Sequence, residues 1–226
     1  MDNTLANEKS LALSYLALRR IIGLLGFSLP FILSLGALIL FQTGIQSSIS
    51  SYYHTGMGDV FVGILCVIGV FLLAYKGYKK PDNEGYEKPD YIARFLGGVF
   101  AVGVALFPIT PDDAPEDASR VIGYVHHAFA ALFFLTLIYF SLCLFTKTDP
   151  NKSPTRRKLQ RNKVYKACGY TMAICILLIG VYFLLPGSIA TSLEGYNPVF
   201  WLESLAVVAF GFSWLTKGEA LLKDEV

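Results

Sequence analysis

Long apolar segments separated by short polar ones dominate this chain. Six of them are long enough, at about 1.5 Å of rise per residue, to cross a hydrocarbon core of about 30 Å as helices. None alternates between polar and apolar positions, and a strand would leave its backbone polar groups unpaired in lipid. The pattern predicts an all-α integral membrane protein, a single transmembrane domain over 1–226 with six transmembrane helices. The predicted spans are about 21–42, 59–75, 91–109, 122–145, 164–185 and 199–215.

The basic residues predict which way this bundle faces. Eighteen of the 19 lysines and arginines fall before the first span, after the last, or in and beside the loops that join spans two to three and four to five. These four regions share one side of a six-span bundle, and only Arg120 falls on the other side. Cytoplasmic loops carry an excess of lysine and arginine. We therefore expect both termini to be cytoplasmic.

Composition agrees with a membrane protein and excludes other classes. Hydrophobic residues make up 54% of the chain and charged residues 16%, whereas soluble domains carry about 25% charged residues. A net charge of +2 is too small to predict nucleic-acid binding, so membrane lipids and a lipid or small-molecule ligand are the expected partners. The cysteines form no Cys-x-x-Cys pair and all lie in apolar segments, which favours free thiols over disulfides or a zinc ribbon. They are Cys66, Cys143, Cys168 and Cys175.

Ionisable residues near the outer ends of the spans are the candidates for a functional site, because burying them in hydrocarbon costs several kcal/mol. All three histidines fall on the non-cytoplasmic side, one before span two and two inside span four. An aspartate opens span two, and a glutamate lies inside span six at about the depth of the span-four histidines, roughly 6 Å below the surface. The predicted ligand-binding residues are His54, Asp59, His126, His127, Glu203, Ser50 and Tyr53.

Helical spacing predicts which of these side chains face the bundle. Asp59 shares a stripe with Gly63 and Cys66, and small residues mark close helix packing in membranes. We therefore expect the aspartate to point inward. Neighbouring residues on a helix point about 100° apart, so only one of His126 and His127 is expected to face the bundle interior.

The segment 46–56, before span two, is dense in hydroxyl and aromatic side chains. One interpretation is an interfacial loop that places Tyr52 and Tyr53 in the aromatic belt of the membrane. The other is a re-entrant polar segment that caps a cavity and supplies His54 to it. Both interpretations stay open on the sequence.

Three functions are compatible with these residues. A cavity open to the outer side would bind or transport a lipid headgroup, a cation or a small solute. The same polar groups would instead form only interhelical hydrogen bonds in a structural or accessory membrane protein. In a metal-dependent lipid hydrolase, His54, Asp59 and His127 would hold a zinc ion, because catalytic zinc takes three His, Asp or Glu ligands and a water.

Ser50 and His54 form a Ser-x-x-x-His element that resembles one in the alkaline ceramidase and progestin-receptor-like superfamily. The resemblance covers five residues and would favour the hydrolase. The chain departs from that superfamily elsewhere, because the superfamily has seven spans and a His-x-x-x-His pair in its last span. Here six spans are predicted and no histidine follows His127.

Over its whole length the chain resembles a group of uncharacterised bacterial multipass inner-membrane proteins. The similarity runs through Ser-Ile-Ser-Ser-Tyr-Tyr-His-Thr at 48–55, Asp-Val-Phe-Val-Gly at 59–63, Phe-Ala-Ala-Leu-Phe at 129–133 and Phe-Trp-Leu-Glu at 200–203. It implies the same topology and a bacterial cytoplasmic membrane. It implies no particular reaction.

Overall fold

The computed structural model describes residues 2–75, 88–111, 114, 120–148 and 153–223, and no strand occurs within them. Every predicted apolar segment coincides with a helix, so the all-α prediction is confirmed. The long helices are α1 (Asp2–Phe41), α2 (Gly58–Ala74), α3 (Lys88–Leu106), α4 (Val121–Tyr139), α5 (Arg156–Phe183) and α7 (Pro198–Lys217). The shorter elements are the 3-10 turn η1 (Ser50–His54), the π-helical turn η2 (Phe140–Leu144) and α6 (Gly187–Glu194).

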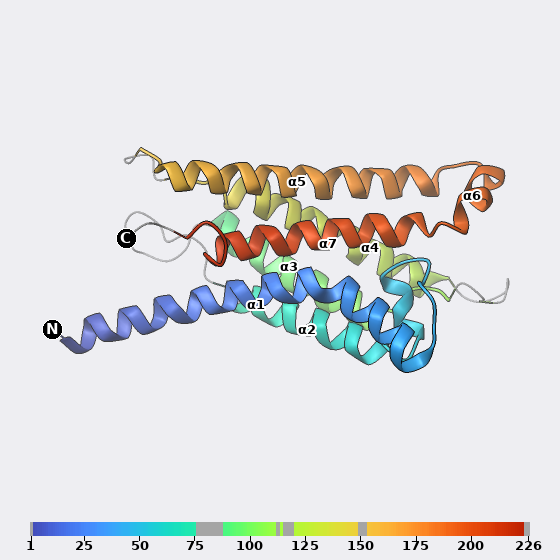
Figure 1. The fold of residues 1–226 in the computed structure, drawn as a ribbon, viewed down its shortest axis with the longest axis horizontal. Coiled ribbons are helices and arrows are strands. Elements are labelled where there is room, and N and C mark those ends of the chain that lie inside the picture. The colour runs from blue at the N-terminus through green and yellow to red at the C-terminus, as the bar shows by residue number, and fades with distance from the viewer. Residues whose placement is uncertain (1, 76–87, 112–113, 115–119, 149–152, 224–226) are drawn as a thin grey trace.

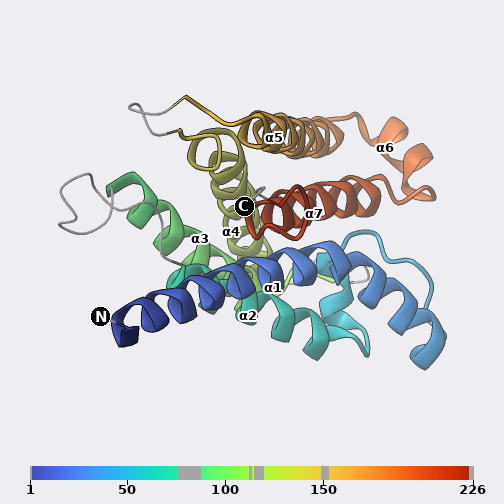
Figure 2. The same ribbon diagram turned by 60° about the vertical axis from the view of Figure 1, so that its left-hand side comes forward.

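The long helices lie side by side with their axes roughly aligned (Figure 1). Helix α7 packs most extensively against α1 and α5, while α3 packs against α2 and α4. Figure 2 shows α7 lying between α1 and α5. Helix α1 begins and α7 ends at one end of the bundle. The opposite end, where α1 finishes and α7 starts, is the end at which the sequence places its candidate site.

Four helices of the described chain are long and apolar enough to cross a membrane, and α2 is apolar but shorter. The four are Tyr15–Phe41, Val121–Leu144, Arg156–Phe183 and Pro198–Lys217. Many of their large apolar side chains point outward, and Ile39 on α1 is 72% exposed. An apolar surface of this extent is compatible with surrounding lipid and is rare on soluble monomers.

Helix α1 is longer at its start than the sequence predicts. The predicted span starts at about residue 21, and the helix that contains it already begins at Asp2. The Nε–H of Arg20 donates to the Gly218 carbonyl at the end of α7 (2.7 Å). A charged side chain thus satisfies one of the carbonyls that a helix end leaves without an intrahelical partner.

Glycines bring the backbones of α1 and α7 into direct contact. A Cβ atom built on Gly211 would lie 2.5 Å from the Phe27 backbone nitrogen and 2.7 Å from the Gly23 carbonyl oxygen. Neither neighbour is a side chain that can rotate away. Close approach through small residues is a common way for membrane helices to associate.

The small-residue stripe of α2 does not face the bundle, which corrects our prediction for Asp59. Asp59 and Gly63 are exposed, and a Cβ atom on Gly63 would meet nothing within 4 Å. The packing face of α2 is instead formed by larger residues such as Phe61 and Leu65, which are 1% and 5% exposed. Small residues predicted the interface here only where a neighbouring backbone comes close, as at Gly98, whose Cβ would lie 2.8 Å from the Gly69 carbonyl oxygen.

Candidate ligand-binding cavity

A cavity of about 690 Å³ lies at the end of the bundle where α7 begins. Its volume is within the range of small-molecule sites, about 300–1,000 Å³. One wall comes from α4 and α5 and is apolar: Ala130, Ala131, Phe134, Ile176, Ile179 and Phe183. The polar part of the lining includes Ser47, Ser48, Ser50, His126, His127 and Glu203.

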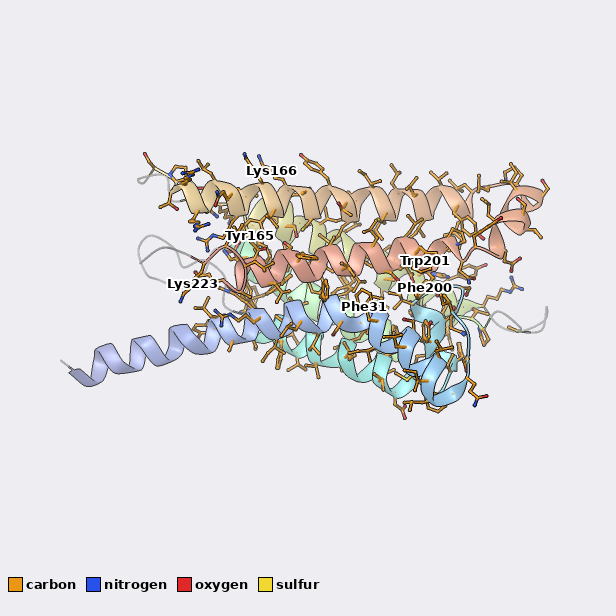
Figure 3. All side chains as sticks on the ribbon, viewed as in Figure 1. Phe31, Tyr165, Lys166, Phe200, Trp201 and Lys223 are labelled. Atoms are coloured by element: carbon orange, nitrogen blue, oxygen red, sulfur yellow. The ribbon has the colours of Figure 1, made fainter. Side chains whose placement is uncertain are left out.

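Glu203 ties the segment 46–56 to α7. Its Oε2 accepts the backbone N–H of Ile49 at 2.7 Å, and the backbone N–H of Ser50 also interacts with the carboxylate. One turn earlier, the backbone N–H of Phe200 donates to the Ser47 carbonyl (3.0 Å). In Figure 3, Phe200 and Trp201 lie at this end of the bundle, near the chain that follows α1. The carboxylate therefore holds the segment across the start of α7.

Serine hydroxyls fold this segment onto itself. The Ser51 hydroxyl forms hydrogen bonds of 2.8 Å with the hydroxyls of both Ser47 and Ser48, and the Ser51 N–H donates to Ser48 Oγ (2.9 Å). Ser50 and Tyr52 are buried. The segment is therefore a compact cap beside the cavity.

Two histidines hydrogen-bond the backbone just after α3. This helix ends at Leu106, two residues before Pro108, which leaves its last carbonyls without intrahelical partners. His126 donates from Nδ1 to the Phe107 carbonyl, and His54 donates from Nε2 to the Ile109 carbonyl, both at 2.6 Å. A carbonyl oxygen only accepts hydrogen bonds, so each of these ring nitrogens carries the proton.

His126 is the histidine that faces the bundle interior. It is 1% exposed, whereas His127 is exposed, as the 100° spacing of adjacent helical residues predicts. The Nε2 atom of His126 is buried and has no hydrogen-bond partner among the described residues. Because Nδ1 holds the proton of the neutral ring, Nε2 is a free acceptor. Both imidazoles border the cavity, and the His127 ring lies 5.8 Å from the Phe183 ring, centroid to centroid.

The structure brings together only part of the predicted site. His126, His127, Glu203 and Ser50 share the cavity lining. The other three predicted residues, His54, Asp59 and Tyr53, do not line it. His54 is held by the Ile109 carbonyl, Tyr53 packs edge-on against His54 with ring centroids 5.2 Å apart, and Asp59 is exposed on the outer side of α2.

The zinc hypothesis finds no geometric support in these positions. Among the described residues, no three His, Cys, Asp or Glu side chains lie close enough together to hold a metal ion. His54, Asp59 and His127 are separated because they belong to η1, the outer face of α2 and the cavity wall. The segment 46–56 borders the cavity but does not supply His54 to it, which corrects the prediction that this segment brings His54 into a cavity.

Sequence reasoning missed the part of the lining that follows α5. The segment between spans five and six contains α6, and its last residue, Glu194, lines the cavity together with Asn197. Asn197 has a φ of 49° and directly precedes α7. Asparagine tolerates this left-handed conformation better than most residues, and an Asn-Pro pair favours a turn. The pair Asn197-Pro198 could therefore have predicted the turn that precedes α7.

No protein family model matches the chain, and neither a curated protein nor a solved structure matches it. The inference of function therefore depends on the cavity itself.

Proposed function

We propose that the protein spans a bacterial inner membrane six times, with both termini in the cytoplasm. The apolar outer surface, the aligned helices and the shared end of the two termini support this topology (Figure 1). Basic residues gather at that same end, where Lys223 is labelled in Figure 3. There Arg161 pairs with Glu219 (3.5 Å) and Lys147 pairs with Asp90 (3.0 Å). An excess of lysine and arginine at one end is typical of the cytoplasmic face.

We propose further that the cavity binds an amphipathic ligand from the outer leaflet, as a binding or transport protein for a lipid or small solute. The main support for this proposal is that the cavity lining has an apolar part and a polar part. Apolar side chains of α4 and α5 form one wall, and two imidazoles and the Glu203 carboxylate lie in the same lining. A pocket of this kind accepts a hydrocarbon chain along one wall and orients a polar head with a few hydrogen-bonding groups.

A structural or accessory role is the second candidate. Glu203 and His126 already make hydrogen bonds that join separate elements of the bundle, and buried polar pairs in membranes often do only that. The cavity, whose lining combines an apolar wall with the Glu203 carboxylate, favours ligand binding over this alternative.

Filling the cavity tests the binding proposal. Gly180 lines the cavity from α5, and a Cβ atom there would meet nothing within 4 Å. Gly180→Phe therefore places a ring in open space, and loss of a helical glycine favours folding by up to about 1 kcal/mol. We expect native mass spectrometry of the detergent-purified protein to show a bound amphiphile on the wild type and none on Gly180→Phe.

Gly63→Phe is the matched control, because Gly63 is also helical, exposed and free of neighbours, but does not line the cavity. It should keep the bound amphiphile. Equal amphiphile content in all three proteins would remove the binding proposal and leave the structural role.

A further inference from the structure

The described residues that line the cavity include acidic side chains but no lysine or arginine. These acidic side chains are those of Glu203 and Glu194. The basic residues of the chain lie mainly toward the other end of the bundle, as Lys223 illustrates in Figure 3. A carboxylate in a low-dielectric surrounding interacts more strongly with a nearby cation than it would in water. The lining therefore suits a cationic head better than a phosphate or carboxylate.

The Glu203 carboxylate also has hydrogen-bonding capacity left for a ligand head. A carboxylate offers about four lone-pair sites, so Glu203 has capacity left after it accepts the N–H groups of Ile49 and Ser50. The hydroxyls of Ser47 and Ser48 are already bonded to Ser51. A ligand head that donates hydrogen bonds is complementary to this carboxylate.

Aromatic rings strengthen the preference for a cation. Tyr124, Phe134, Tyr182 and Phe183 all border the cavity. The faces of such rings attract ammonium groups by about 0.5–2 kcal/mol, depending on how far the pair is shielded from water. The adjoining apolar wall between α4 and α5 provides space for a hydrocarbon chain.

From these features we infer that the ligand is a cationic amphiphile: a primary ammonium head, without phosphate, on a single hydrocarbon chain. Its head lies beside the Glu203 carboxylate, and its chain lies along Ala130, Phe134 and Ile176. This inference rests on the proposed binding function and adds the chemical class of the ligand. An amphiphile with a hydroxyl head would satisfy the acceptors but not the charge.

Three probes with the same chain and different heads test this inference: dodecylamine, dodecanol and dodecanoate. At pH 7 an amine is protonated and a fatty acid is largely ionised, since their ordinary pKa values lie near 10 and 4–5. Native mass spectrometry of the full-length protein in a non-ionic detergent measures the bound fraction of each. We expect dodecylamine to bind at least about tenfold more tightly than dodecanoate, a difference of about 1.4 kcal/mol, with dodecanol between them.

Glu203→Gln removes the charge while the amide oxygen can still accept the Ile49 N–H, so the cap should stay in place. We expect this variant to lose the preference for dodecylamine over dodecanol while it continues to bind dodecanol. Asp59→Asn removes an exposed carboxylate outside the cavity and should keep the full preference.

Two results would overturn the ligand class. One is equal or tighter binding of dodecanoate to the wild type, and the other is an unchanged preference for the amine in Glu203→Gln. If one of these results is found but the probes that bind the wild type do not bind Gly180→Phe, the cavity binds amphiphiles of another class. The proposed function then stands. If probe binding is the same in Gly180→Phe and the wild type, the proposed function itself fails.

Discussion

Replacing Gly211 by leucine is expected to prevent the bundle from forming. The new side chain would meet the backbone of α1 at Phe27 and Gly23, at distances of 2.5 and 2.7 Å from its first carbon. Overpacking of flexible side chains costs about 1–3 kcal/mol, and more where the neighbour cannot move. Because these neighbours are backbone atoms, we expect a loss of at least about 3 kcal/mol, which is a large part of the 5–15 kcal/mol that stabilises typical proteins.

The measurement is the yield and thermal unfolding of the detergent-purified variant, with Gly63→Leu as its control. Gly63 is helical like Gly211 but faces open space, so leucine there should leave both quantities close to the wild type. Near-wild-type folding of Gly211→Leu would mean that α1 and α7 are farther apart than described. Separation of α1 from α7 in Gly211→Leu would also disrupt the cavity, because α1 leads into the cap and α7 carries Glu203.

Glu203→Leu is expected to release the cap at the mouth of the cavity. The substitution leaves the Ile49 N–H without the acceptor that now lies 2.7 Å away. An unsatisfied buried donor costs about 1–3 kcal/mol. Since each 1.4 kcal/mol is a factor of ten in an opening equilibrium, amide exchange in residues 47–52 should accelerate by about ten- to a hundredfold.

Hydrogen–deuterium exchange with peptide resolution measures this effect. Glu203→Gln keeps an oxygen acceptor and should show a smaller acceleration, while Asp59→Leu removes an exposed carboxylate from α2 and should show none. Unchanged exchange at 47–52 in Glu203→Leu would show that the serine hydrogen bonds alone hold the cap.

Much of the fold is predictable because lipid-facing helices must be long and apolar whatever they pack against. The end of each apolar segment therefore lies within a few residues of a helix end, as for the segment 59–75 and helix α2, Gly58–Ala74. Helix α1 begins before the predicted span because polarity indicates where a helix leaves the hydrocarbon, and not where the helix itself starts. Helix α6 was missed because eight residues with no buried side chain carry little hydrophobic signal.

The candidate site was predictable only in part, for a reason visible in Asp59 and Glu203. Both are carboxylates near the outer end of a helix, and their positions in the predicted spans give them similar depths in the membrane. Their difference is rotational: Glu203 borders the buried side of α7, whereas α2 turns Asp59 outward because its larger residues form the packing face. His54 was misplaced because its partner, the Ile109 carbonyl, lies 55 residues away in the chain, and the two meet only when the helices pack.

The central proposal is that His126, His127 and Glu203 border an amphiphile-binding cavity in the outer leaflet of a six-span protein. An experimental density map of the protein in lipid nanodiscs measures this most directly. We expect all six long helices to lie within the bilayer, the basic ends together on one side, and elongated density in the cavity between the α4–α5 wall and Glu203. A map in which α2 or α3 lies outside the bilayer, or in which side chains close the cavity, would contradict it.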